Sequence, residues 1–146
     1  MNSAPVILVC DDDQDDQLLI ESAFAEACID AGFRFAGDGT ELIEYLQSNG
    51  VEHPRPDIIL LDLNMPKMDG RRTLEWIKSH PEYRAIPVVI YTTTRERSEI
   101  QRCYRTGANS FMTKCSTFKD LVEKVEVFAR YWMDITELPK SAGCQH

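Results

Sequence analysis

The sequence alternates between five short, almost wholly apolar runs and longer segments with the periodicity of helices. The apolar runs are residues 5–10, 33–36, 57–62, 87–92 and 110–113. Between and after them, apolar residues recur every three or four positions, which predicts helices over 15–31, 40–46, 70–79, 98–105 and 118–134. Strand–helix units in series predict parallel strands with right-handed crossovers and helices on both faces of the sheet. The pattern therefore predicts an α/β fold.

Length and charge limit the domain organisation and the partners. We expect residues 1–139 to form a single domain with an extended C-terminal helix, and residues 140–146 to be a disordered tail. Nothing after the last predicted helix is long enough for a DNA-binding output domain. The net charge of −8 also argues against a nucleic-acid surface, which needs clustered Lys and Arg. We expect no nucleic-acid partner.

The sequence indicates a cytoplasmic location. It does not open with a signal peptide, and no apolar run approaches the roughly 18 residues that a membrane span requires. The five cysteines are scattered and odd in number, and they form no CxxC pair. This pattern favours neither a disulfide framework nor a zinc site. We therefore expect a cytoplasmic protein that does not associate with membranes.

Polar side chains follow four of the predicted strands. Asp11 and Asp12 come after the first strand, Asp62 ends the third, Thr92 ends the fourth, and Lys114 follows the fifth. Open parallel sheets bind ligands at the carboxyl ends of their strands, and in the strand order 2-1-3-4-5 these four strands are neighbours. We therefore expect the five side chains to converge at one edge of the sheet.

This set of groups suits phosphoryl transfer. Carboxylates about 4 Å apart repel by about 4 kcal/mol per pair at an effective dielectric near 20. A hard divalent cation such as Mg²⁺ relieves that repulsion through oxygen ligands. Asp62 can then stay ionised and attack phosphorus, while Lys114 and the Thr92 hydroxyl stabilise the charge on the phosphoryl oxygens. By contrast, Asp13, Asp15 and Asp16 are interpreted as solvated acids that favour the start of a helix.

Four motifs carry a resemblance to a known family. The segments VCDDD, DLNMPKMDG, VVIYTTT and SFMTK, in this order and spacing, resemble the receiver domains of response regulators in bacterial two-component systems. The similarity covers about residues 6–131. It implies a flavodoxin-like, doubly wound (βα)5 fold with a five-stranded parallel sheet in the order 2-1-3-4-5. It also implies a phosphorelay function, in which a sensor histidine kinase is the phosphoryl donor.

The resemblance also assigns roles to individual residues. It implies that Asp62 is the phosphoacceptor, Lys114 the phosphate-binding lysine, Thr92 the switch hydroxyl and Phe111 the aromatic that changes rotamer. The Mg²⁺ ligands that it implies are Asp11, Asp12, Asp62 and the backbone carbonyl of Asn64.

Two further features concern the C-terminal third of the chain. The segment FKDLVEKVEVFARYWMDITELP resembles the short receivers paired with phytochrome-type histidine kinases, which implies a bacteriophytochrome as the kinase. Receivers usually carry Pro after the phosphate-binding lysine, in a cis peptide, but here the residue is Cys115. Because a cis bond before a non-proline residue costs about 2.5–4 kcal/mol, we expect a trans Lys114–Cys115 bond. Lys114 then approaches the phosphate from a shifted angle.

Three classes of function fit these residues. The first is a signalling module that catalyses only its own phosphorylation and dephosphorylation and acts by changing its affinity for partners. The second is a Mg²⁺-dependent phosphatase of the haloacid-dehalogenase type, which the missing second Asp after Asp62 and the third-strand position disfavour. The third is a phosphorylation-independent pseudo-receiver adaptor, which the intact set of site residues disfavours.

An apolar stripe continues past the end expected for a minimal receiver. Positions 121, 125, 128, 132 and 135 follow alternating steps of four and three, as along one face of a helix. Either the extra residues fold back onto the domain, or they form a twofold homodimer interface, which we prefer. The expected interface residues are Phe128, Tyr131, Trp132, Ile135 and Leu138.

Overall fold

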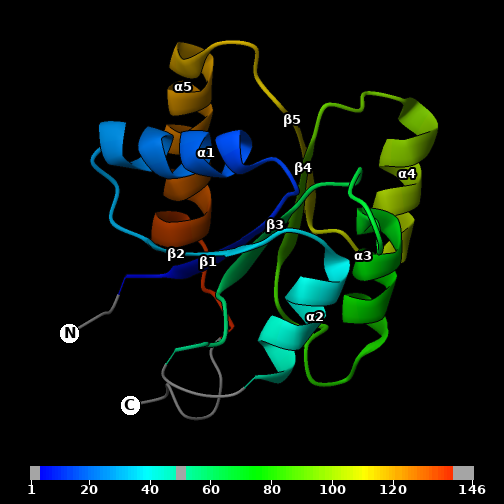
Figure 1. Ribbon diagram of the computed structural model, residues 1–146. Coiled ribbons are helices and arrows are strands. Elements are labelled where there is room, and N and C mark those ends of the chain that lie inside the picture. Colours follow the sequence, from blue (N-terminus) through cyan, green and yellow to red (C-terminus); the bar gives the residue numbers. More distant parts are fainter. Residues whose placement is uncertain (1–3, 49–51, 140–146) are drawn as a thin grey trace.

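A single parallel sheet forms the centre of the molecule (Figure 1). The computed structural model describes residues 4–48 and 52–139, so the predicted tail lies outside the described residues. The sheet has the order β2-β1-β3-β4-β5, which confirms the predicted flavodoxin-like topology. The strands are β1 (Val6–Cys10), β2 (Gly32–Ala36), β3 (Ile58–Leu61), β4 (Val88–Thr92) and β5 (Ser110–Thr113).

Helices cover both faces of the sheet (Figure 1). On one face lie α1 (Gln14–Glu26) and α5 (Phe118–Ala129), and on the other lie α2 (Gly39–Gln47), α3 (Gly70–Ser79) and α4 (Arg97–Thr106). Successive strand residues point to opposite faces, so Ile7 and Val9 pack under α1 and α5, whereas Leu8 and Cys10 belong to the other core. The apolar strands are therefore buried on both sides, as expected for parallel strands.

Short polar side chains fix where four of the helices begin. Asp13, Asp38, Asp69 and Thr117 are the N-caps of α1, α2, α3 and α5, and each accepts a hydrogen bond from backbone N–H groups of the first helical turn. Each of these helices follows the carboxyl end of a strand. The caps therefore hold the first turns of the helices around the edge of the sheet where the predicted site residues lie.

Helix α1 is shorter than the sequence predicts. The periodicity indicates a helix that continues to residue 31, but α1 ends at Glu26. Cys28 adopts a left-handed φ of 59°, and the Ile29 N–H donates to the Phe24 carbonyl at 2.9 Å. This hydrogen bond closes the end of the helix, and β2 begins at Gly32, one residue before the predicted strand.

The C-terminal helix also departs from the prediction. Helix α5 ends at Ala129 and passes into a π-helix, η1 (Arg130–Ile135), in place of one α-helix that reaches residue 134. The Thr136 N–H donates to the Tyr131 carbonyl at 2.9 Å, which is an i→i−5 bond. Because the π-helix winds more widely, the alternating four-and-three stripe does not continue on one face beyond α5.

The predicted interface residues separate into buried and exposed sets. Phe128 is only 6% exposed and belongs to the core beneath α1 and α5, so in the single chain it offers little surface for the predicted interface. Trp132 and Leu138 are partly buried against the same core. Tyr131 and Ile135 are 51% and 64% exposed. The segment thus folds back onto the domain in part and leaves two apolar side chains in solvent.

No helix within residues 4–48 and 52–139 has both the length and the apolar character that crossing a membrane requires.

Candidate functional site

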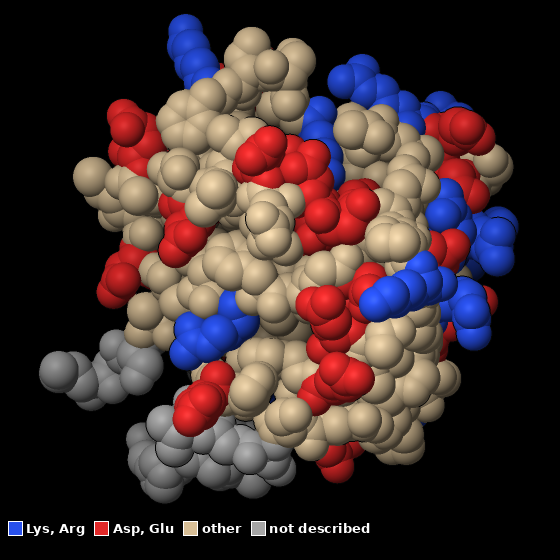
Figure 2. Space-filling view, in the orientation of Figure 1, with Lys and Arg blue, Asp and Glu red and all other residues tan. Residues whose placement is uncertain are grey.

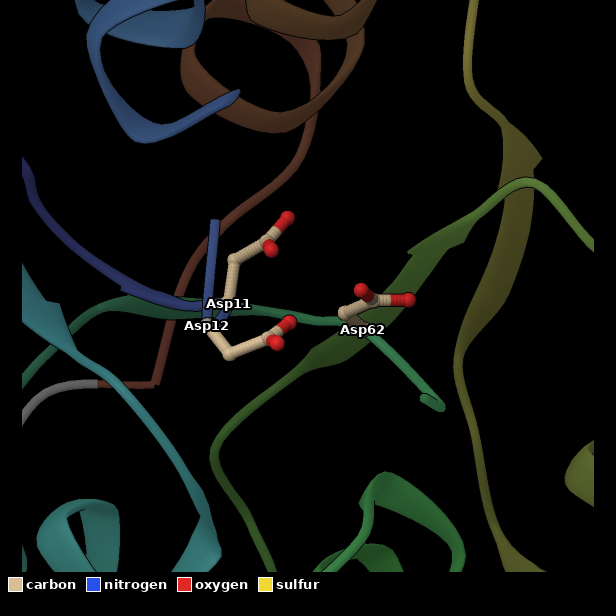
Figure 3. A group of neighbouring side chains, drawn as sticks. All are labelled: Asp11, Asp12 and Asp62. Atoms are coloured by element: carbon tan, nitrogen blue, oxygen red, sulfur yellow. The ribbon is translucent and has the colours of Figure 1, made fainter. Parts of the chain in front are cut away.

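Three carboxylates meet at the carboxyl ends of β1 and β3 (Figure 3). In the sheet register Cys10 lies beside Leu61, so the next residues, Asp11 and Asp62, are neighbours. The Asp62 N–H donates to the Cys10 carbonyl at 3.0 Å, which fixes this arrangement. One carboxylate oxygen from each of Asp11, Asp12 and Asp62 lies within 4.8 Å of the others. The prediction that these acids converge is therefore matched by the geometry.

The three acids differ in burial. Asp11 and Asp62 are 2% and 6% exposed, whereas Asp12 is exposed. Burial raises the pKa of the Asp11 carboxyl, and hydrogen bonds from Lys114 and the Asp13 N–H oppose that shift. Figure 2 shows that Asp and Glu side chains gather over the middle of this face, while Lys and Arg lie mainly toward the α4 side. The site therefore lies in a strongly acidic region of the surface.

Lys114 brings a positive charge to the acids. It follows β5, and its N–H donates to the Thr92 carbonyl at 2.8 Å, which continues the pairing of β4 with β5. Its Nζ lies 2.8 Å from Asp11 Oδ2 and 3.4 Å from Asp62 Oδ2. Burial alone would lower the pKa of Lys114, but the hydrogen bonds to Asp11 and Asp16 outweigh it and raise the pKa. Lys114 is therefore a fixed cation beside Asp62.

Thr92 supplies an unpartnered hydroxyl at the same edge. It is the last residue of β4 and has no exposed surface. Over residues 4–48 and 52–139, Thr92 Oγ1 is the buried side-chain polar atom that lacks a hydrogen-bond partner. A buried, unsatisfied hydroxyl costs free energy unless a ligand or another group completes its hydrogen bonds. Because β4 pairs with β3, this hydroxyl lies on the strand next to the one that Asp62 follows, which suits donation to an anionic oxygen bound at Asp62.

The two other predicted site residues lie at the edges of this arrangement. Asn64 is exposed; its N–H lies 3.4 Å from Asp62 Oδ1, and its Nδ2 lies 3.5 Å from Thr94 Oγ1. Phe111, on β5, is half-buried against the core beneath α2, α3 and α4. Asn64 is thus next to the acids, while Phe111 lies on the face of the sheet that carries α4.

The donor set fits a hard divalent cation. Three carboxylates offer oxygen atoms in one small space, and at about 4 Å each ionised pair costs about 4 kcal/mol at an effective dielectric near 20. Lys114 compensates one charge only. Mg²⁺ accepts a few protein oxygens and completes its shell with water and phosphate oxygens, so these residues suit it.

Sequence reasoning misses one residue of this site. The sequence favours a solvated acid at a helix start for Asp16, but its Oδ2 lies 2.7 Å from Lys114 Nζ. Asp13 does cap α1, and Asp15 is exposed as expected. The sequence holds no signal that separates Asp16 from Asp15, because both are acids in the first turn of α1.

The loop after Lys114 has the predicted peptide geometry, because the Lys114–Cys115 bond is trans. Beside it a groove of about 680 Å³ extends along β5 and α5. Its wall includes Lys114 and Cys115 at one end and Phe128, Tyr131 and Trp132 at the other. The groove thus connects the acidic site to the C-terminal segment.

Comparison with known proteins identifies the family. Residues 7–126 match the response regulator receiver domain. This chain belongs to the response regulator receiver family. It is 35% identical to the response regulator Rcp1 of Synechocystis sp. over 140 residues, which cover 94% of this chain and 95% of Rcp1. The family assignment favours the signalling module over the phosphatase alternative.

Solved structures give the same result. The phosphorylated cyanobacterial phytochrome response regulator RcpA has a TM-score of 0.86 at 34% identity and covers 94% of this chain and 100% of its own. The Mn²⁺-bound form of Rcp1 has a TM-score of 0.83 at 35% identity, with coverage of 93% and 99%. A response regulator in red light signaling of R. palustris has a TM-score of 0.88 at 31% identity, with coverage of 94% and 99%. The chain is therefore a receiver-domain response regulator that is homologous to phytochrome response regulators.

Proposed function

We propose that Asp62 accepts a phosphoryl group from a sensor histidine kinase in a Mg²⁺-dependent phosphorelay. The observation that carries this proposal is the grouping of Asp62 with a second buried acid, the Lys114 ammonium and the unpartnered Thr92 hydroxyl. A structural cluster of ion pairs would have no use for a buried hydroxyl without a partner, whereas a phosphoryl oxygen is an acceptor for it.

The transfer requires one bond to form and one to break. An Asp62 carboxylate oxygen attacks phosphorus, and the P–N bond of the kinase phosphohistidine breaks with its electron pair left on the imidazole nitrogen. Lys114 Nζ, already 3.4 Å from Asp62 Oδ2, pairs with the phosphoryl oxygens. The Thr92 hydroxyl donates to a phosphoryl oxygen, which satisfies its missing hydrogen bond.

Asp11, Asp12, Asp62 and the carbonyl of Asn64 are the proposed ligands of Mg²⁺. When bound, the cation neutralises charge on the phosphoryl oxygens and removes the repulsion among the carboxylates. The Mn²⁺-bound form of the relative Rcp1 supports the proposal that this chain binds a divalent cation. Mg²⁺ is the proposed physiological ion because the donors are all hard oxygens.

We further propose that the kinase is a bacteriophytochrome, since RcpA is a phytochrome response regulator and the R. palustris relative acts in red light signaling. Residues 1–139 would form one receiver domain in the cytoplasm, without a nucleic-acid partner. It would catalyse only its own phosphorylation and dephosphorylation. Phe111 and Thr92 would transmit phosphorylation to the face that carries α4 and β5, and thereby change affinity for partners.

A homodimer through the C-terminal segment is the proposed output. Tyr131 and Ile135 are exposed, and Tyr131 and Trp132 line the groove along α5, while Leu138 is partly buried against the same core as Trp132. Exposed aromatic residues are frequent interface anchors. Sedimentation of wild type with and without beryllofluoride should show a dimer that Tyr131→Glu weakens. Leu18→Glu, an exposed change on α1, is the control. Wild type that stays monomeric at tens of micromolar in both states would exclude the dimer.

Intact-mass spectrometry tests the central proposal. With Mg²⁺ and acetyl phosphate or a cognate kinase, the wild-type mass should rise by one phosphoryl group. Asp62→Asn should remain unlabelled, while Asp30→Asn, which removes an exposed acid beyond the end of α1, should label like wild type. Wild type that stays unlabelled with a panel of kinases and with acetyl phosphate would instead support the pseudo-receiver adaptor.

A further inference from the structure

Lys114 is shared among three carboxylates, and the closest of them is not a proposed ligand of the cation. Its Nζ lies 2.7 Å from Asp16 Oδ2, 2.8 Å from Asp11 Oδ2 and 3.4 Å from Asp62 Oδ2. The ammonium is therefore displaced from the phosphoacceptor toward the start of α1. Three N–H donors suffice for three acceptors, so a new anionic group at Asp62 has to compete with a group that Lys114 already binds.

The start of α1 presents Asp16 from a fixed position. The Asp13 side chain caps the helix by accepting from the N–H groups of Asp15 and Asp16. Gln17 Nε2 donates to the Asp11 carbonyl at 2.7 Å, and the Asp13 N–H donates to Asp11 Oδ1 at 3.0 Å. These bonds tie the first turn of α1 to the end of β1. Asp16 thus has little freedom to follow Lys114 if the ammonium moves toward Asp62.

Asp16 is the carboxylate that can give up Lys114 at least cost. The Asp11 side chain is 3% exposed and also accepts a hydrogen bond from the Asp13 N–H, so it stays at the site where Mg²⁺ is proposed to bind. The Asp16 side chain is 30% exposed, and water can solvate it once the ammonium leaves. Among the described residues, Lys114 is the hydrogen-bond partner of the Asp16 carboxylate.

We propose that Asp16 is a positioning residue that holds Lys114 on the α1 side of the site before phosphorylation and yields it to the phosphoryl group afterwards. This inference rests on the proposed role of Asp62. The Asp16–Lys114 pair stabilises the unphosphorylated protein and so opposes phosphorylation. When Lys114 moves to the phosphoryl oxygens, Asp16 becomes a free, solvated charge on the first turn of α1.

Beryllofluoride binding at saturating Mg²⁺ measures this competition. Asp16→Asn should lower the beryllofluoride dissociation constant about fivefold, which corresponds to the loss of one competing ion pair at a partly exposed site. Asp15→Asn is the matched control. It also removes one carboxylate from the first turn of α1, but the Asp15 side chain is exposed and does not contact Lys114. Both variants lose one negative charge from the first turn of α1, so the difference between them reports the contact with Lys114. Asp16→Glu should restore the wild-type value.

A double-mutant cycle separates positioning from a merely structural role. In a Lys114→Ala background, Asp16→Asn should have no effect beyond that of Asp15→Asn, because the contact it removes no longer exists. Suppose that wild type binds beryllofluoride and accepts a phosphoryl group. Equal dissociation constants for Asp16→Asn and Asp15→Asn, with Lys114 present, would then overturn the role of Asp16 alone. A wild type that does neither overturns the proposed function of Asp62, and the role of Asp16 with it.

Discussion

Replacement of Thr92 by Val should stabilise the protein and at the same time impair its response to phosphorylation. Thr92 has no exposed surface, and within the described residues its hydroxyl has no hydrogen-bond partner. A buried polar group left without a partner costs about 1–3 kcal/mol. Val has nearly the same shape and favours strands. Thr92→Val should therefore raise the free energy of unfolding by about 1 kcal/mol.

Thr73→Val is a control with the opposite expected sign. Thr73 is also fully buried, but its Oγ1 donates to the Asp69 carbonyl at 2.7 Å. Loss of that bond should lower the free energy of unfolding by about 1 kcal/mol. Because the Thr73 hydroxyl already donates to the Asp69 carbonyl, it is not available to a phosphoryl oxygen, and phosphorylation by acetyl phosphate should continue at a rate near that of wild type.

Urea unfolding of the Mg²⁺-free proteins and phosphorylation kinetics with acetyl phosphate are the two assays. Thr92→Val should unfold at a higher urea concentration than wild type, with an unchanged slope, and should be phosphorylated more slowly or give a shorter-lived product. If Thr92→Val is destabilised as much as Thr73→Val, the hydroxyl has a structural partner. If Thr92→Val keeps wild-type phosphorylation, the hydroxyl has no role at the phosphoryl group. Either result refutes the reasoning.

Three further predictions concern stability, metal and pH. Lys78 Nζ donates to the carbonyls of Arg84 and Ile86 and to Asn109 Oδ1, so Lys78→Met should lower the free energy of unfolding in urea by about 2 kcal/mol without a change in phosphorylation rate. A Mg²⁺ concentration of about 100 times the wild-type dissociation constant should stabilise wild type by about 2.7 kcal/mol in thermal unfolding. The same Mg²⁺ concentration should stabilise Asp12→Asn by less, and an equal stabilisation would exclude Asp12 as a ligand. Burial raises the pKa of Tyr91 from 10.0 to about 12, so the folded state favours the neutral phenol. The contribution of Tyr91 to stability should be present below pH 10 and fall between pH 10 and 12. In a spectrophotometric titration, Tyr91→Phe should remove the phenol that ionises at the highest pH.

Much of the fold and of the site follows from local sequence. The five apolar runs predict the strands because parallel strands are buried on both faces, and parallel order then brings the residues after four strands to one edge. The convergence of Asp11, Asp62 and Lys114 also requires the strand order 2-1-3-4-5, which the resemblance to receiver domains implies. The bounds of α3 and β5 agree with the sequence because Asp69 caps α3 and short apolar runs end at polar residues.

Other features depend on contacts that periodicity does not encode. The π-helical turn after Ala129 changes which residues face the core, so Ile135 is exposed although the stripe places it on one face with the buried Leu121, Val125 and Phe128. The pairing of Asp16 with Lys114 joins residues 98 positions apart, and it depends on how α1 leaves β1. A single first-turn acid looks the same in sequence whether it faces solvent or an ammonium.

Chemical mapping of the phosphorylated residue tests the central claim most directly. After phosphorylation with Mg²⁺ and acetyl phosphate, borohydride reduces an aspartyl phosphate to homoserine, and tandem mass spectrometry of the peptides locates the converted residue. We expect homoserine at position 62 alone, dependent on Mg²⁺. Conversion at Asp11 or Asp12 in place of Asp62, or labelling that persists at the wild-type rate without Mg²⁺, would contradict the proposed mechanism.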